Sequence, residues 1–188
     1  MFRPHLKYRK KKMNIEKEII SKRNIDYLFL SGTIDIDSEY FIQKIEEGIN
    51  SNNNLSYKTN VKGKHTSFEY FIDDKNFHDF ALNIVDYLET IEFNFKPYEL
   101  KEAWGIKLGY ADYSQIHDHF GCYLSGSLYL NEHNQELIFP EIKKSIKPKK
   151  GQFVIFSSDL KHYTKKNTFN ENKYGIGFNF LVRSVLSE

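Results

Sequence analysis

Three histidines have the spacing to hold one transition-metal ion. His117 and His119 stand two residues apart in a β-prone run, Ser114–His119. Side chains two apart on a strand point to the same face, so these two imidazoles can converge while Asp118 points away. His162, which follows another strand-like run, is the candidate third ligand. Imidazole suits iron, zinc, copper and nickel, so the residue types leave the metal open. A His-x-His pair alone is a weak signal, because ordinary surface or core histidines share its spacing.

The second half of the chain reads as short β-strands separated by turn residues. Many short strands at close spacing are typical of a sandwich or jelly roll. A jelly roll brings distant strands together across its mouth, which could deliver His162 to the other two histidines. The expected strands are Ala103–Leu108, Ser114–His119, Tyr123–Leu130, Leu137–Phe139, Ser145–Lys147, Gln152–Phe156 and Tyr174–Val182.

Helical spacing dominates before residue 100. Ser38 can cap a first helix, and a short strand is expected at Tyr27–Leu30. Helices followed by strands predict an α+β fold with the helices packed on one sheet face. Apolar residues recur at helical spacing in two stripes, a pattern that is typical of core packing. The two stripes are Phe41, Ile42, Ile45 and Ile49, and Phe77, Phe80, Ala81, Ile84, Val85 and Leu88.

Length and composition predict one domain with a substantial core. The chain has 188 residues, of which 40% are hydrophobic and 16% aromatic. Its single cysteine, Cys122, cannot form a disulfide within the chain, which favours a cytoplasmic location. No apolar run reaches the roughly 20 residues that a membrane helix needs, and no secretory signal follows the basic start.

The positive charge is concentrated at the start of the chain. Removing the six basic residues found there changes the formal net charge from +2 to −4. We interpret residues 1–13 as a solvated basic tail in preference to a nucleic-acid-binding arm, and residues 14–188 as a single domain with its core at about 100–183. The six are Arg3, Lys7, Arg9, Lys10, Lys11 and Lys12.

The segment from Trp104 to Leu181 resembles a known enzyme core. It is similar to the double-stranded β-helix, a cupin-like jelly roll, of Fe(II)- and 2-oxoglutarate-dependent dioxygenases, in particular a branch common in phage and marine bacterial genomes. Its motifs occur in the family's order: His-x-His, a Ser-Gly…Tyr strand, Pro-x-x-Gly before a hydrophobic strand, a histidine, and a basic residue. Here these are His117 and His119, Ser125, Gly126 and Tyr129, Pro148 and Gly151, His162, and Lys173.

The resemblance implies an iron(II) site and a co-substrate site. The three histidines would hold the iron, and Lys173 would pair with the far carboxylate of 2-oxoglutarate. Lys173, Gly175, Gly177 and Asn179 share one face of a strand, and the small residues leave room for a small dicarboxylate. Asn179 and Tyr129 are the expected additional donors. The implied reaction uses O2 to hydroxylate an unactivated C–H bond, with release of succinate and CO2.

Two departures from the family pattern keep alternatives open. His119 stands where most of the wider family has Asp or Glu. Lys173 replaces the more common Arg, and Gly175 stands where a serine often occurs. A three-histidine cupin-type dioxygenase or isomerase without 2-oxoglutarate is the first alternative. A non-catalytic jelly-roll binding module is the second. The substrate is open among a small metabolite, a peptide side chain and a nucleobase.

Overall fold

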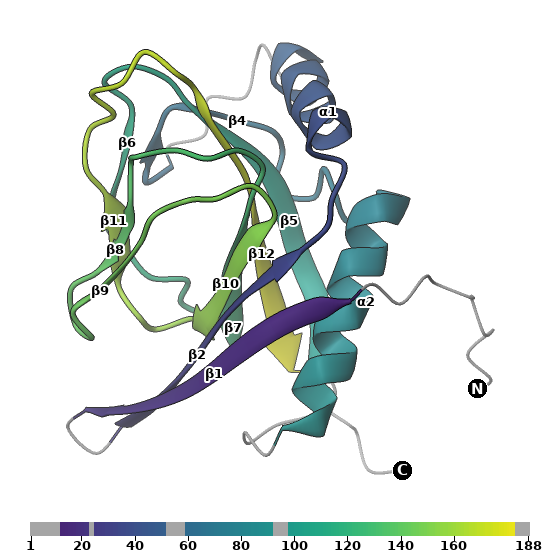
Figure 1. The fold of residues 1–188 in the computed structure, drawn as a ribbon, viewed down its shortest axis with the longest axis vertical. Coiled ribbons are helices and arrows are strands. Elements are labelled where there is room, and N and C mark those ends of the chain that lie inside the picture. The colour runs from purple at the N-terminus through teal and green to yellow at the C-terminus, as the bar shows by residue number, and fades with distance from the viewer. Residues whose placement is uncertain (1–11, 23–24, 52–58, 92–97, 183–188) are drawn as a thin grey trace.

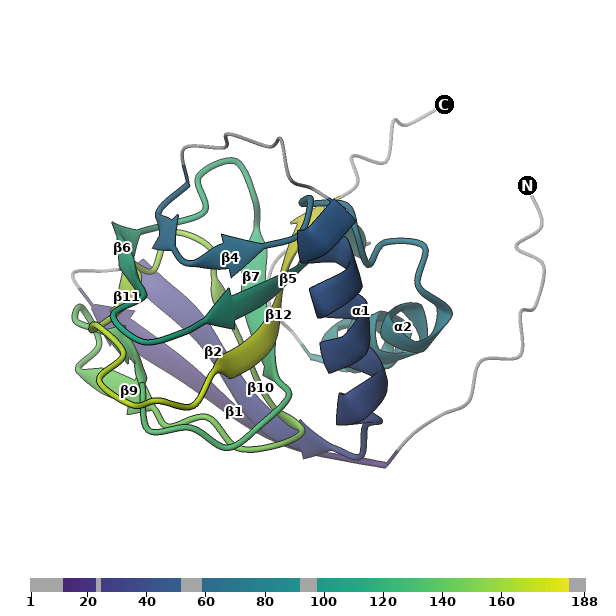
Figure 2. The same ribbon diagram turned by 90° about the horizontal axis from the view of Figure 1, so that it is seen from above.

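Two stacked β-sheets, with helices on one outer side, form the molecule (Figures 1 and 2). The computed structural model describes residues 12–22, 25–51, 59–91 and 98–182. Within these residues every strand pair is antiparallel. The basic start, residues 1–11, lies outside them, so its interpretation as a tail stays a prediction.

Among the described residues, the larger sheet has seven strands and the smaller has five. In spatial order the larger sheet contains β1 (Met13–Lys22), β2 (Ile25–Ile34), β10 (Gln152–Ser157), β7 (Leu124–Tyr129), β12 (Lys173–Val182), β5 (Tyr98–Leu108) and β4 (Lys64–His65). The smaller sheet contains β3 (Val61–Lys62), β6 (Tyr113–His117), β11 (His162–Thr164), β8 (Leu137–Phe139) and β9 (Lys144–Ile146).

The predicted α+β jelly roll is confirmed, and most predicted strands are found within a few residues of their expected bounds. β1 was not predicted. Its central residues, Glu16–Ile19, are all exposed, so the strand lacks the apolar alternation that marks a half-buried strand. It forms instead by backbone pairing with β2 at the edge of the larger sheet. The expected domain start at residue 14 falls one residue inside β1.

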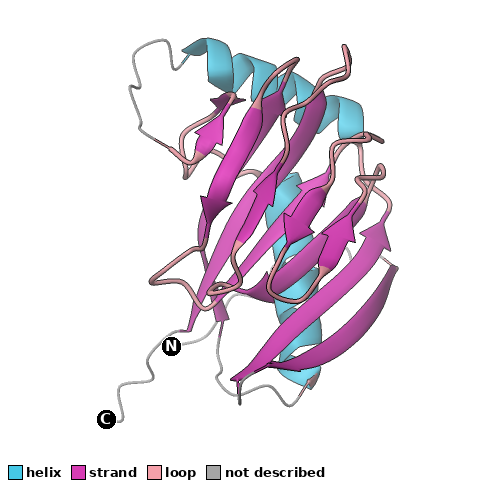
Figure 3. Ribbon diagram, turned by 90° about the vertical axis from the view of Figure 1, so that its left-hand side faces the viewer, coloured by secondary structure: helices cyan, strands magenta, loops and turns pink. Residues whose placement is uncertain are grey.

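The helices α1 (Ser38–Ser51) and α2 (Lys75–Thr90) cover the outer face of the larger sheet (Figures 2 and 3). The predicted stripe of α2 is confirmed, since Phe77 and Phe80 are buried and both rings pack on Phe178 of β12. The predicted cap of α1 is wrong. The Asp37 carboxylate accepts the Tyr40 N–H at 3.0 Å, and Asp37 therefore caps the helix in place of Ser38.

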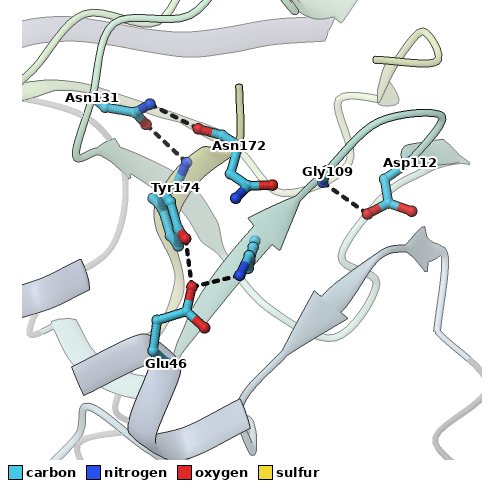
Figure 4. Close-up of polar contacts among 7 residues, drawn as sticks. Glu46, Gly109, Asp112, Asn131, Asn172 and Tyr174 are labelled. Carbon is cyan, nitrogen blue, oxygen red and sulfur yellow. Dashed lines mark hydrogen bonds and ion pairs between the residues drawn. The ribbon is translucent and has the colours of Figure 1, made fainter. Parts of the chain in front are cut away.

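Helix α1 is also tied to the sheet by polar contacts near the end of β5 (Figure 4). The Glu46 carboxylate accepts from Lys107 Nζ at 2.6 Å and from the Tyr174 hydroxyl. Tyr174 N–H donates to Asn131 Oδ1 at 2.8 Å, while Asn131 Nδ2 donates to the Asn172 carbonyl at 2.9 Å. These contacts fix the start of β12, the strand that begins with Lys173.

The end of β5 is closed by a short turn. The Gly109 N–H donates to Asp112 Oδ2 at 2.8 Å, which ties the turn between β5 and β6 (Figure 4). No helix in the described ranges is long and apolar enough to cross a membrane.

Candidate metal centre

His117, His119 and His162 meet between the two sheets. β6 ends at His117 and β11 begins at His162, and these two residues pair directly across the smaller sheet. Nitrogen atoms of the three rings all lie within 4.8 Å of one another. His119 Nε2 lies 3.3 Å from His162 Nε2. Within the described residues, these three form the group of His, Cys, Asp or Glu side chains arranged to hold a metal.

His119 reaches this position from a turn and not from the strand in which it was predicted. The strand stops at His117, so strand alternation no longer places the residues that follow. The His119 N–H donates to the Ser158 carbonyl at 2.8 Å, and the Cys122 N–H donates to the His119 carbonyl at 3.0 Å. These backbone contacts hold the turn that brings His119 to the group. Asp118 lies outside the group, as expected.

Two of the histidines have a fixed tautomer. His117 Nδ1 lies 2.7 Å from the Gln115 carbonyl, and His162 Nδ1 lies 3.0 Å from the Leu160 carbonyl. A carbonyl only accepts, so each Nδ1 carries the hydrogen and each Nε2 keeps its lone pair. Metal-binding histidines are oriented by this kind of contact to the other ring nitrogen.

Burial keeps the three rings neutral. It lowers the pKa of His117, lowers the pKa of His119 to about 4, and lowers the pKa of His162 well below its ordinary value. The neighbouring imidazoles lower the pKa values of His119 and His162 further. Because metal binding requires the neutral ring, protons compete little with a metal here at neutral pH.

The inner face of the larger sheet lies opposite the histidines. The strands β7, β12 and β5 are neighbours, and their register aligns inward-facing residues in rows across the sheet. Read from β7 through β12 to β5, the rows are Tyr129, Gly175 and Ile106; Ser127, Gly177 and Trp104; and Ser125, Asn179 and Glu102. The first two rows hold glycines at their centre, which leaves space, whereas the third row is polar throughout.

A cavity of about 70 Å³ lies over the glycine rows. It is lined by the three histidines together with Lys173 and Tyr129. One water needs about 10–15 Å³ measured in this way, so the space suits a few waters or one small molecule. We call it the inner cavity. Glycine is required on its floor, because a Cβ on Gly177 would lie 2.6 Å from the Trp104 ring.

Two buried polar side chains, Lys173 and Tyr129, line the inner cavity. The Lys173 side chain is only 6% exposed, and burial lowers its pKa to about 7. Its Nζ donates to the Gln135 carbonyl at 3.0 Å and lies 5.8 Å from the centre of the Tyr129 ring. The buried Tyr129 hydroxyl has no hydrogen-bond partner among the described residues, and burial raises the pKa of Tyr129. A buried ammonium with no carboxylate among the described residues of the cavity, and an unpaired hydroxyl beside it, suit an anionic ligand.

Asn179, the third residue expected to bind the co-substrate, does not line the inner cavity. Its Oδ1 accepts from Ser125 Oγ at 2.8 Å, and its Nδ2 donates to Glu102 Oε2 at 2.6 Å. Asn179 lies on the face that we predicted, but it follows Lys173 by six residues on an extended strand. At about 3.3 Å per residue, both cannot contact one end of a small dicarboxylate.

A second cavity, of about 290 Å³, adjoins the histidines and opens to solvent. It shares His117, His119, Val61 and Trp104 with the inner cavity. We call it the outer cavity. Its remaining lining residues are Thr59, Asn60, His65, Phe68, Glu102, Asp118 and Asn179.

Sequence reasoning missed the residues that support Lys173. The Gln135 N–H donates to His133 Nδ1 at 2.9 Å, and His133 Nε2 donates to the Glu171 carbonyl at 3.1 Å. This arrangement places the Gln135 carbonyl at Lys173 Nζ. Gln135 lies between two predicted strands, Tyr123–Leu130 and Leu137–Phe139, and a contact made through a backbone carbonyl leaves no signal in the residue types.

No family model matches the chain, and no curated protein matches its sequence. Solved structures match its fold. The viral collagen prolyl hydroxylase of Paramecium bursaria Chlorella virus-1, solved with 2-oxoglutarate, is 15% identical with a TM-score of 0.60 over 93% of this chain and 96% of its own.

Two further structures show the same similarity. HygX of Streptomyces hygroscopicus, solved with nickel, 2-oxoglutarate and hygromycin B, is 11% identical with a TM-score of 0.61 over 83% of this chain and 82% of its own. A Trichoplax adhaerens prolyl hydroxylase, solved with a peptide fragment of hypoxia inducible factor, is 12% identical with a TM-score of 0.59 over 94% and 87%. The resemblance stated from the sequence is thereby confirmed for the fold, which is that of 2-oxoglutarate-dependent oxygenases.

Proposed function

We propose that this protein is an Fe(II)- and 2-oxoglutarate-dependent oxygenase that hydroxylates an unactivated C–H bond. One observation carries the proposal. Three neutral histidines, a buried lysine and a buried unpaired tyrosine hydroxyl line the same small cavity. The fold shared with oxygenases solved with 2-oxoglutarate supports it.

The histidine group fits iron(II). Imidazole nitrogen is a suitable ligand for this metal, and two of the rings have their Nε2 lone pairs fixed by backbone contacts. The three ligands are neutral, so a bound iron keeps both of its positive charges. This charge favours a dianionic chelating co-substrate. When bound, iron(II) and 2-oxoglutarate supply oxygen activation, coupled to release of succinate and CO2.

The inner cavity fits the far end of 2-oxoglutarate. Lys173 offers a cation, since an ammonium has three donor hydrogens and the Gln135 carbonyl uses one of them. Tyr129 offers a hydroxyl that is unpaired within the part of the chain that the structure describes. In this proposal Asn179 positions Glu102 and does not contact the co-substrate.

Aromatic side chains shield the inner side of the metal centre from water. The rings of Phe156 and Phe139 lie with their centres 4.9 Å and 5.6 Å from that of His162. Exclusion of water strengthens the interaction of Lys173 with an anion and limits side reactions. We also propose a cytoplasmic location, which the single Cys122 supports because a reducing compartment keeps thiols free.

The test is anaerobic titration of 2-oxoglutarate into the iron-loaded protein, followed by its visible charge-transfer band and by calorimetry. We expect saturable binding, and succinate release once oxygen is admitted. Absence of 2-oxoglutarate binding by iron-loaded wild type would contradict the proposal and would favour a metal dioxygenase or isomerase that needs no co-substrate.

A further inference from the structure

We propose that the outer cavity binds the substrate to be hydroxylated, and that this substrate carries a protonated amine. Glu102 and Asp118 hold the amine beside the metal centre. The inference rests on the proposed function and names its substrate class: an alkylammonium compound, either free or as the side chain of a peptide.

The position of the outer cavity makes it the place for a second ligand. It contacts His117 and His119 but not Lys173 or Tyr129, which line the inner cavity only. At about 290 Å³ it is roughly four times the volume of the inner cavity, and it opens to solvent. A molecule could therefore enter the outer cavity while a dicarboxylate occupies the inner one.

The charge of the outer cavity selects for a cation. Of the described residues that line it, the two with a formal charge are Glu102 and Asp118, and both are acidic. Lys101 Nζ lies 3.8 Å from Glu102 Oε1, but the Lys101 side chain is 42% exposed and is not part of the lining. An exposed ion pair of this length contributes little. An anionic substrate would be repelled by both carboxylates.

Glu102 is held in place by two neighbouring strands. Ser125 Oγ donates to Asn179 Oδ1, which orients the amide so that its Nδ2 donates to Glu102 Oε2. The three residues form one row across β7, β12 and β5, and Ser125 and Asn179 are buried. A carboxylate has about four acceptor sites, so Glu102 keeps capacity for a substrate N–H.

Asp118 contributes the second carboxylate from the turn beside His119. It is partly exposed and makes no hydrogen bond or ion pair with a described residue. Asp118 is not part of the histidine group but lines the outer cavity, so its charge is available to a ligand there.

An aromatic wall completes a site for an alkylammonium group. The rings of Phe68 and Trp104 line the outer cavity and meet edge to face, with centres 5.3 Å apart. Aromatic faces attract ammonium groups and also bury the adjoining methylenes. The combination of two carboxylates and two rings suits an amine attached to an alkyl chain.

The experiment measures binding of defined probes to the iron-loaded, 2-oxoglutarate-saturated protein without oxygen. N-acetyl-lysine N-methylamide represents a peptide side chain, and 1,5-diaminopentane represents a free amine. N-acetyl-norleucine N-methylamide has a side chain of similar shape without the ammonium. We expect at least one amine probe to bind about tenfold more tightly than the neutral probe. Tighter binding of the lysine derivative would indicate a peptide side chain as the substrate, and tighter binding of 1,5-diaminopentane would indicate a free amine.

Variants locate the interaction. Glu102→Gln and Asp118→Asn should each weaken amine binding about three- to tenfold and leave the neutral probe unaffected. Glu102→Asp keeps the charge and should restore part of the loss. Glu132→Gln and Asp73→Asn remove the same charges from exposed positions outside both cavities and should change nothing. Thermal unfolding of each variant confirms that it is folded.

The proposal is overturned if neither amine binds more tightly than the neutral probe, or if Glu102→Gln and Asp118→Asn both bind amines like wild type. The same samples are titrated with 2-oxoglutarate. Normal 2-oxoglutarate binding without amine binding means that this inference alone is wrong. Failure to bind 2-oxoglutarate contradicts the proposed function itself.

Discussion

The two cavities beside the histidine group differ in size, exposure and charge. The inner cavity is small, and its charged residue is the deeply buried Lys173. The outer cavity is open, and its charged residues are the partly exposed Glu102 and Asp118. A buried charge interacts strongly with one ligand of matching shape, whereas exposed charges interact weakly and are screened by salt. The contrast suits a fixed co-substrate on one side and a more variable substrate on the other.

The cavities also differ in how the chain builds them. The inner cavity is created by the register of the paired strands, which places glycines of β12 between larger residues of β7 and β5. The outer cavity takes residues from the segment 59–68 and the turn after β6, together with Glu102 and Trp104 in the middle of β5 and Asn179 on β12. Loops and short strands tolerate change more easily than a sheet interior. The segment 59–68 is therefore the part of the outer cavity in which substrate preference can change without loss of the metal centre.

Removal of a proposed metal ligand should have the largest effect, because both cavities depend on the metal. We expect His119→Ala to weaken iron(II) binding by at least about a hundredfold, since loss of a contact that merely orients a ligand costs about 10- to 100-fold. Anaerobic iron titration measures this change. The exposed His78 on α2 offers a matched control, and His78→Ala should bind iron like wild type. Equal binding by His119→Ala would show that His119 is not a ligand.

Lys173→Ala should disable the inner cavity selectively. A charge-assisted contact contributes about 1.5–3 kcal/mol, so 2-oxoglutarate affinity should be weakened by a factor of about ten to over a hundred. Iron affinity should stay nearly unchanged, because Lys173 is not in the histidine group. Lys173→Arg should recover part of the affinity, as guanidinium also pairs with carboxylate. A wild-type affinity for 2-oxoglutarate in Lys173→Ala would place the co-substrate elsewhere.

The pH dependence of 2-oxoglutarate binding should report the same lysine. Burial lowers the pKa of Lys173 to about 7, so above this pH the ligand-free protein loses the proton that the dicarboxylate needs. Affinity should be level below pH 7 and fall by up to about tenfold per unit above it. In the absence of ligand, the unfolded chain binds more protons than the folded one between about pH 7 and 10.5, so stability should rise with pH across this window. A flat affinity profile up to pH 9 would contradict a charged contact from Lys173, and Lys173→Arg should give such a flat profile.

Tyr129→Phe should have opposite effects on stability and on binding. The buried hydroxyl has no partner, and an unsatisfied buried polar group costs about 1–3 kcal/mol. The ligand-free variant should therefore be more stable than wild type by up to about that amount, while 2-oxoglutarate affinity falls about three- to tenfold. Thermal unfolding with and without 2-oxoglutarate measures both. Lower stability without ligand would show that the hydroxyl is satisfied in the folded protein.

Asp118→Asn should have the smallest effect on the metal centre, within about threefold in iron affinity, because Asp118 lies outside the histidine group. A large loss of iron binding with an unchanged circular dichroism spectrum would make Asp118 a ligand. It would then also remove Asp118 from the outer cavity and end the contrast between the two sides.

Much of the metal centre could be predicted from the sequence because its signals are local. His117 lies at the end of a strand whose residue types favour β-structure, and Lys173 begins a strand whose small residues alternate along one face. The stripe of α2 follows from helical periodicity, and the structure buries it as expected. These features depend on neighbours within a few residues, where backbone geometry fixes the direction of each side chain.

Tertiary structure alone decided which predicted faces meet. Asn179 shares a face with Lys173 in the sequence pattern, yet the register of three strands joins it to Ser125 and Glu102. Asn179 and Glu102 line the outer cavity. The Gln135 carbonyl reaches Lys173 from a separate loop, and backbone contacts with Ser158 turn His119 toward the metal centre. Alternation sets the side to which a residue points, but the residues that it meets there depend on pairing between distant segments. That pairing is set by the packing of the whole chain, because a shift of one residue in register would move the buried side chains of a strand to its other face.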